Sequence, residues 1–138
     1  MKNIQIITNS LPIAEELADS DMDIILPGGI LRKEMRSLIG PLAEKNLKEY
    51  FCNIAFIGVD SIDAEGIYTP NVYEAYLTRI MTQIAQKVIV VCDSSKFNRR
   101  SFVKISELKK IDILITDTGI PDEYISLLKE LGVELVIA

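Results

Sequence analysis

An α/β fold with a mostly parallel, twisted sheet flanked by helices is predicted by three features of this sequence. Six short apolar segments are rich in isoleucine and valine, and their apolar residues run mostly unbroken instead of alternating with polar ones. Unbroken apolar strands are typical of parallel sheets that are buried on both faces. Amphipathic helical patterns lie between most of these segments, and strands that alternate with helices indicate right-handed βαβ units.

The predicted strands are spread over the whole chain of 138 residues. They comprise residues 3–8, 23–27, 53–58, 87–92, 112–116 and 133–138. The segment "ILRKEMRSLIG" is ambiguous, and we assign it loosely to a further strand that leads to Gly40. A chain of this length fits one domain with a real core.

Helices are predicted between these strands from their end signals. Ser10 is the predicted N-cap of "SLPIAEELAD", and a second helix covers "PLAEKNLKEYF". The helix in "PDEYISLLKELG" is expected to end at Gly132, because glycine is favoured just after the last helical turn.

The clearest helix follows the stretch "TPN". Thr69 is its predicted N-cap, and Pro70 fits the first turn, where a missing N–H is no loss. One apolar stripe at helical spacing is expected to pack on the sheet. The stripe consists of Tyr73, Tyr76, Leu77, Ile80, Ile84 and Val88.

Composition and charge exclude several classes of protein. The net charge of −5 and the isoelectric point of about 4.8 argue against nucleic-acid binding by this segment itself, which would require clustered lysine and arginine. A hydrophobic fraction of 49% excludes a disordered chain, yet no apolar run approaches the length of a membrane span. The N-terminus lacks the apolar stretch of a signal peptide. We therefore expect a cytoplasmic protein that does not bind membranes.

Histidine is absent from the sequence, which removes the Ser/His/Asp and Cys/His catalytic arrangements and the commonest metal ligand. Cys52 and Cys92 lie in apolar surroundings without a CxxC motif, so we expect reduced cysteines of the core. No metal and no cofactor are expected. Any catalysis would depend on carboxylates, lysine, tyrosine or serine.

Polar residues gather where the predicted strands end, and ligands of open α/β sheets bind beyond the carboxyl ends of the strands. The candidates for ligand binding are Thr8, Asn9, Ser10, Gly28, Gly29, Asp60, Asp63, Asn71, Glu74 and Lys96. Each also has a structural explanation as a helix cap, a turn or a strand end in water. Both interpretations stay open, and a place at the surface stays an alternative for Ser94, Arg99 and Arg100.

The chemistry of these candidates suits a small phosphorylated polyol. Free N–H groups around Ser10, at a helix start, would suit a phosphate. Gly28 and Gly29 would let the backbone approach a ligand closely. Lys96 offers a point charge, with Asp93 and Ser95 shaping the turn that aims it. The carboxylates would accept hydrogen bonds from sugar hydroxyls, or one would act as a general base if desolvated.

Five blocks in this order resemble the effector-binding domain of DeoR-family transcription regulators. They are "TNSLPIAEELA", "LPGGILR", "SLIGPLAEKNL", "FCNIAFIGVDSIDAEGIYTPNVYEAYLTRIM" and "VIVVCDSSKFNRRSF". The resemblance runs from Thr8 to about Asp117, and its most specific part extends from "AFIGVDSID" through "CDSSKF". It implies a fold similar to pentose-phosphate isomerases and coenzyme A transferases.

By the same resemblance, residues 8–10 correspond to a phosphate-side loop and Asp60 and Asp63 to an acidic loop. Glu74 falls near the catalytic acid/base position of the isomerases, and Lys96 falls on the lysine of a "DxSK" motif. Family members use this pocket to sense a phosphorylated sugar or sugar derivative without turning it over. They begin with a winged helix-turn-helix, and their sensor domain opens with a helix and a strand that ends in an Asp-x-Gly-Thr-Thr loop. Neither feature occurs in this sequence.

The resemblance thus implies that residues 1–138 form a single effector-binding domain, a fragment of a longer chain. Its expected role is ligand sensing for a DeoR-type repressor of carbohydrate metabolism. DNA would be contacted only through a helix-turn-helix outside this chain, and a homo-oligomer is expected. Two alternatives stay open. One is a sugar-phosphate isomerase-like enzyme with Glu74 as base and Lys96 as electrostatic partner, and the other is an oligomerisation module with a vestigial pocket.

Overall fold

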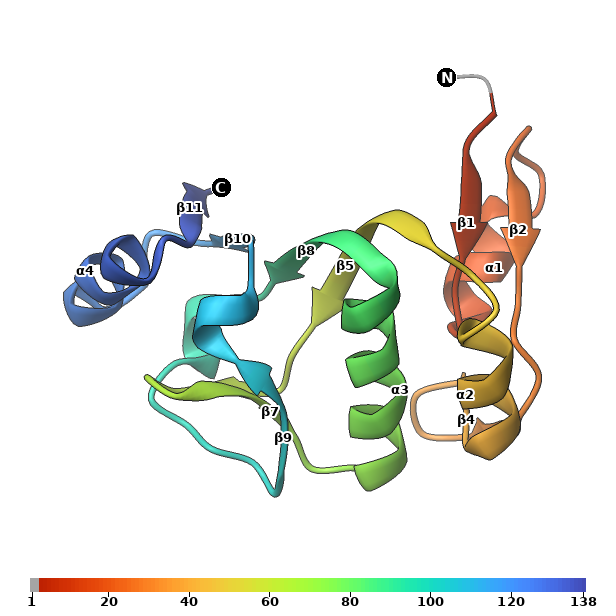
Figure 1. Ribbon diagram of the computed structural model, residues 1–138, viewed down its shortest axis with the longest axis horizontal. Helices are drawn as coiled ribbons and strands as arrows, with labels where there is room; N and C mark the ends of the chain where they lie inside the picture. The colour runs from red at the N-terminus through yellow and green to blue at the C-terminus, as the bar shows by residue number, and fades with distance from the viewer. Residues whose placement is uncertain (1–2) are drawn as a thin grey trace. The chain divides into compact units, whose positions relative to one another are not determined.

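The computed structural model describes residues 3–138 and confirms the predicted α/β fold class. The chain divides into two compact units, Met1–Tyr50 (unit 1) and Phe51–Ala138 (unit 2). Figure 1 shows the elements of each unit along the chain.

Unit 1 contains a parallel pair of strands and a hairpin. Strands β1 (Gln5–Ile7) and β2 (Asp23–Ile25) pair in parallel and are connected by helix α1 (Leu11–Leu17). Strands β3 (Ile30–Arg32) and β4 (Ser37–Ile39) form an antiparallel hairpin, and helix α2 (Pro41–Leu47) follows. The ambiguous segment is therefore two short strands, because the chain turns between them and Arg36 takes a left-handed conformation with φ 51°.

Unit 2 is built on a parallel four-stranded sheet. Its order is β11 (Glu134–Ile137), β10 (Ile113–Thr116), β8 (Ala85–Val91) and β5 (Cys52–Gly58). Two helices, α3 (Val72–Ile84) and α4 (Asp122–Leu131), lie along the chain between these strands. All six strands predicted from the sequence are therefore present, and every pair in this sheet is parallel.

Unit 2 also contains a second sheet that was not predicted from the sequence. It is antiparallel, with β7 (Gly66–Thr69) between β6 (Ser61–Ile62) and β9 (Val103–Glu107). Two short 3-10 helices, η1 (Ser94–Lys96) and η2 (Leu108–Lys110), flank β9. The strands of this sheet lie between polar turns and are too short to show a clear period.

The two faces of the parallel sheet differ in burial. Ile57, Val90 and Leu114 share one face and join the core cluster with residues of α3 and α4. On the opposite face, Ile54 is 48% exposed and Phe56 is 67% exposed. The expectation that these strands are buried on both faces is therefore wrong for β5, and Val91 of β8 and Val136 of β11 are also exposed on this face. Helices α3 and α4 both contribute residues to the one core cluster that contains Ile57, Val90 and Leu114.

The predicted start of α3 is also wrong. Thr69 is the last residue of β7 and pairs with Val103 of β9. Because it belongs to this sheet, it does not cap the helix. Asn71 is the N-cap instead, and its Oδ1 accepts a hydrogen bond of 2.9 Å from the backbone N–H of Glu74. Pro70 precedes this cap. The hydroxyl of Thr69 is buried and has no partner within residues 3–138.

The apolar stripe of α3 is partly different from the prediction. Tyr73 and Tyr76 are 49% and 42% exposed, whereas Ala75 and Thr78 are buried. Val88 lies in β8, because the helix ends at Ile84. Other helix ends agree with the sequence: Ser10 caps α1, and Gly132 ends α4 in the left-handed conformation at φ 76°. In residues 3–138, no helix combines the length and apolar character needed to cross a bilayer.

Replacing Asn71 by alanine is expected to lower the free energy of unfolding by about 1 kcal/mol, because the helix loses its capping side chain. Asn71→Asp keeps a capping oxygen and serves as the matched control, with little expected change. Thr69→Val should leave stability unchanged or raise it, since the Thr69 hydroxyl makes no hydrogen bond with a described residue. Urea unfolding of the three variants measures these differences. A larger loss in Thr69→Val than in Asn71→Ala would contradict the assignment of the cap.

Candidate functional site

The residues that follow β1 hydrogen-bond within unit 1. The N–H of Ser10 donates to the Thr8 hydroxyl oxygen at 3.1 Å, and the N–H of Leu11 donates to the Arg36 carbonyl at 2.9 Å. The N–H of Ile13 donates to the Ser10 hydroxyl oxygen, and Pro12, between Leu11 and Ile13, has no N–H. The expectation of free N–H groups at this helix start is therefore wrong, because they already have acceptors.

The glycine pair after β2 has a packing role. The N–H of Gly28 donates to Asn46 Oδ1 at 2.8 Å. Gly29 has φ +134°, and a Cβ built there would lie only 2.5 Å from the carbonyl oxygen of Ile39. Gly29 is required because β4 passes so close to it.

Two predicted residues, Asp60 and Lys96, follow the carboxyl ends of neighbouring strands in unit 2. Strands β5, β8 and β10 are neighbours in the sheet, so the residues after them follow adjacent carboxyl ends. Asp60 follows β5, and its side chain is exposed. Lys96 ends η1 after β8 and is half-buried. Its ammonium group makes no ion pair with any residue of the range 3–138.

Two carboxylates shape the loop that contains Lys96. Asp93 Oδ1 accepts from both the N–H and the hydroxyl of Ser95, and these hydrogen bonds lower the pKa of Asp93. Asp117, after β10, accepts from the N–H of Ser94 at 2.8 Å and from the N–H of Gly119 at 2.8 Å. The hydrogen bonds from Ser94 and Gly119 lower the pKa of Asp117 as well. The predicted role of Asp93 and Ser95 in this turn is confirmed.

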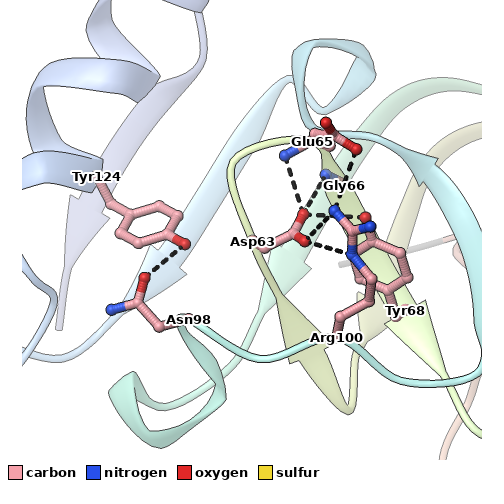
Figure 2. Close-up of polar contacts among 7 residues, drawn as sticks. All are labelled: Asp63, Glu65, Gly66, Tyr68, Asn98, Arg100 and Tyr124. Atoms are coloured by element: carbon pink, nitrogen blue, oxygen red, sulfur yellow. Dashed lines mark hydrogen bonds and ion pairs between the residues drawn. The ribbon is translucent and has the colours of Figure 1, made fainter.

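Asp63 lies at the centre of a polar cluster, which Figure 2 shows. Its Oδ1 accepts hydrogen bonds from the N–H groups of Glu65 and Gly66 and from the Tyr68 hydroxyl, at 2.9, 3.1 and 2.9 Å. Its Oδ2 accepts from Arg100 Nε at 2.7 Å. Burial raises the pKa of Asp63, but these hydrogen bonds outweigh burial and lower it. Both carboxylate oxygens are thus engaged within unit 2.

The contacts of Arg100 and Tyr124 were not predicted from the sequence. The Arg100 guanidinium pairs with Glu65 at 3.1 Å and lies 5.3 Å from the centre of the Tyr68 ring. The Tyr124 hydroxyl donates to Asn98 Oδ1 at 3.0 Å, as Figure 2 shows. The partners of both are distant in sequence, so no local pattern indicates them.

The remaining candidates offer little catalytic chemistry. Asn71 caps α3, and Glu74 is half-buried in the first turn of that helix. Burial, followed by the neighbouring charge of Asp93, raises the pKa of the Cys92 thiol to about 11. Burial also raises the pKa of Cys52. Both shifts disfavour the thiolate, and the described residues contain no group of side chains suited to a metal ion.

Comparison with known protein families gives one match over most of the chain. The family described as the DeoR C terminal sensor domain matches residues 1–118. The matched range includes every candidate residue and ends before α4.

Three relatives show the extent of the similarity. A protein of Escherichia coli O157:H7, provisionally assigned as the aga operon transcriptional repressor, is 41% identical over 132 residues, which cover 94% of this chain and 49% of that protein. The HTH-type transcriptional regulator GlpR of Haloferax volcanii is 37% identical, with 94% and 51% covered. The HTH-type transcriptional repressor GlcR of Bacillus subtilis is 38% identical, with 96% and 52% covered. The chain spans about half the length of the curated relatives it matches.

Proposed function

Because this chain belongs to the family of DeoR C-terminal sensor domains, we propose that it senses a small effector on behalf of a transcription repressor. Its relatives are named as transcriptional regulators and repressors, two of them of the HTH type. In this proposal both units form one sensor domain in the cytoplasm. A helix-turn-helix outside the 138 residues contacts DNA, which agrees with the net charge of −5.

The proposed effector is a phosphorylated sugar or sugar derivative of carbohydrate metabolism. The observation that supports it most is Lys96, a half-buried residue on a loop shaped by Asp93 and Asp117, whose ammonium makes no ion pair within the described residues. A lysine held in this way suits a phosphate group. Asp60, exposed after the neighbouring strand, would accept hydrogen bonds from sugar hydroxyls. Effector binding would favour one arrangement of the regulator over another.

We propose binding without turnover. The relatives are named as regulators, and burial raises the pKa of both cysteine thiols, which disfavours the thiolate that a cysteine nucleophile requires. An isomerase would require Glu74 as base and Lys96 as its electrostatic partner. A coupled isomerase assay above background on this chain would favour that alternative.

Thermal unfolding in the presence of candidate effectors tests the proposed function. The panel contains glucose phosphate, fructose phosphate, ribose phosphate and inorganic phosphate, each sugar phosphate beside its unphosphorylated sugar. At least one sugar phosphate should raise Tm, and its free sugar should not, since a ligand at a hundredfold excess over Kd stabilises by about 2.7 kcal/mol. No shift with any member, for a longer regulator that contains this chain and binds its operator normally, would refute the proposal.

We also propose that the chain self-associates through the open face of the parallel sheet. Ile54, Phe56, Val91 and Val136 share this face, and each is at least 36% exposed. The outer edge of β5 is unpaired within residues 3–138, and such an edge invites pairing. Light scattering should therefore report an oligomer.

Phe56→Lys is expected to convert this oligomer to a monomer, because it places a charge on the open face. Phe102→Lys is the matched control, since Phe102 is 83% exposed but lies outside the parallel sheet. A monomeric wild-type chain, or an oligomer that Phe56→Lys leaves intact, would contradict the proposed interface.

A further inference from the structure

We propose that Asp63 and Tyr124 are positioning residues for Lys96, and that they hold residues 94–101 from two sides. We call this segment the lysine loop. The inference rests on the proposed function of Lys96 as the contact for an anionic effector. In this inference, the position of the Lys96 ammonium and its regulation depend on Asp63 and Tyr124, which do not touch the effector.

The first side of the lysine loop is fixed by β6 and the turn that follows it. The N–H of Arg99 donates to the Ile62 carbonyl at 3.2 Å, and the hydroxyls of Ser61 and Ser101 lie 2.7 Å apart. Ser61 is 2% exposed and Ile62 is fully buried, so this side belongs to the packed interior of unit 2. Asp63 is the next residue along the chain, and its Oδ2 accepts a hydrogen bond of 2.7 Å from Arg100 Nε.

The second side is fixed by α4. The Tyr124 side chain is 4% exposed, and its hydroxyl donates to Asn98 Oδ1 at 3.0 Å. Its ring meets the Phe97 ring at an angle of 66°, with the two centres 4.9 Å apart. Asn98 adopts φ +59°, a left-handed conformation that asparagine tolerates better than most residues. The Tyr124 hydrogen bond thus holds Asn98 in an uncommon conformation.

Lys96 directly precedes Phe97, the first of the residues that these supports contact. Its N–H donates to the Asp93 carbonyl at 3.2 Å, so its backbone moves with the turn. Lysine has a long flexible stem, and the reach of its ammonium depends on where the backbone anchors it. A shift of Phe97 or Asn98 would move that anchor. Small displacements of a contact group cost affinity, because the ligand no longer meets the charge at hydrogen-bond distance.

This arrangement also links the proposed effector site to α4. Helix α4 follows residue 118, where the family match ends, and its Tyr124 contacts both Phe97 and Asn98. If α4 stabilises the geometry that binds an effector, then a bound effector stabilises the contact with α4 by the same factor. The lysine loop would therefore transmit occupancy of the site to the C-terminal helix.

Tyr124→Phe tests the inference, because it removes the hydroxyl that holds Asn98 and keeps the ring against Phe97. Tyr73→Phe is the matched control, since Tyr73 is 49% exposed on α3. Titration calorimetry uses the sugar phosphates named above and inorganic phosphate. We expect Tyr124→Phe to weaken binding about fivefold, within the usual range for residues that act through others. Asp63→Asn should also weaken binding, whereas Tyr73→Phe should match the wild type.

Amide hydrogen exchange without ligand provides a second measurement that does not depend on the effector. Exchange at residues 95–98 should become about tenfold faster in Tyr124→Phe and unchanged in Tyr73→Phe, because local opening becomes easier. A general loss of stability would instead accelerate exchange across the core strands, including β8 and β10.

The possible outcomes separate the two proposals. If the wild type binds a probe and Tyr124→Phe binds it equally well, the positioning inference is overturned and the proposed function stands. Faster exchange without weaker binding also overturns it. If the wild type binds no probe, the proposed function falls together with the claim about affinity. The exchange rates then still decide whether Tyr124 holds the lysine loop.

Discussion

Replacing Lys96 by alanine is expected to weaken the binding of phosphorylated sugars strongly while leaving the free energy of unfolding nearly unchanged. The ammonium makes no ion pair within residues 3–138, so its removal breaks no ionic contact of the described fold. A hydrogen bond to a charged group contributes about 1.5 to 3 kcal/mol, so effector binding should weaken about 10- to 100-fold. Titration calorimetry and urea unfolding on the same preparation measure both quantities.

Two further variants make the result for Lys96 specific. Lys110→Ala removes an exposed lysine of η2 and should leave both binding and stability at the wild-type values. Lys96→Arg keeps the charge and should retain part of the affinity. If Lys96→Ala lowers the free energy of unfolding by more than about 1 kcal/mol, the side chain has a structural role and its assignment to the effector is wrong.

The sequence predicted the parallel sheet well because its strands are short, apolar and separated by helical patterns. The antiparallel sheet of β6, β7 and β9 was not predictable in the same way. Ser61–Ile62 is only two residues long, and β7 pairs with β9 across more than thirty positions of sequence. That long-range pairing also moved the helix cap from Thr69 to Asn71. Local propensity favours either residue as a cap, and only the tertiary structure decides between them.

The candidate site was predictable where its contacts are local. Asp93 and Ser95 are two residues apart, and the turn that they form is visible in the sequence. The partners of Arg100 and Tyr124 are 37 and 26 residues away, so no pattern in the chain indicates them. For Asp63, the position on an acidic loop was predicted but its contacts were not. Its oxygens accept hydrogen bonds from donors of its own unit.

Replacing Asp63 by alanine is expected to lower the free energy of unfolding by about 2 to 3 kcal/mol. The side chain is only 19% exposed, and it accepts from two backbone N–H groups, the Tyr68 hydroxyl and Arg100. Its removal leaves the buried Tyr68 hydroxyl without this acceptor, and a buried polar group left unsatisfied costs about 1 to 3 kcal/mol. Glu65→Gln is the matched control. Glu65 also pairs with Arg100 but is 70% exposed, so the change should be at most about 0.5 kcal/mol.

The charge on Asp63 makes its contribution depend on pH, and Asp63→Asn isolates that dependence. Because the folded pKa of Asp63 is lowered, the unfolded chain binds more protons between that value and the ordinary value of about 3.9. The stabilisation is therefore fully present above the unfolded pKa and is lost as the pH falls through the folded pKa. The difference in free energy of unfolding between wild type and Asp63→Asn should be largest near neutral pH and shrink below about pH 4. A difference that stays constant down to about pH 3 would show that shape, and not charge, gives Asp63 its role.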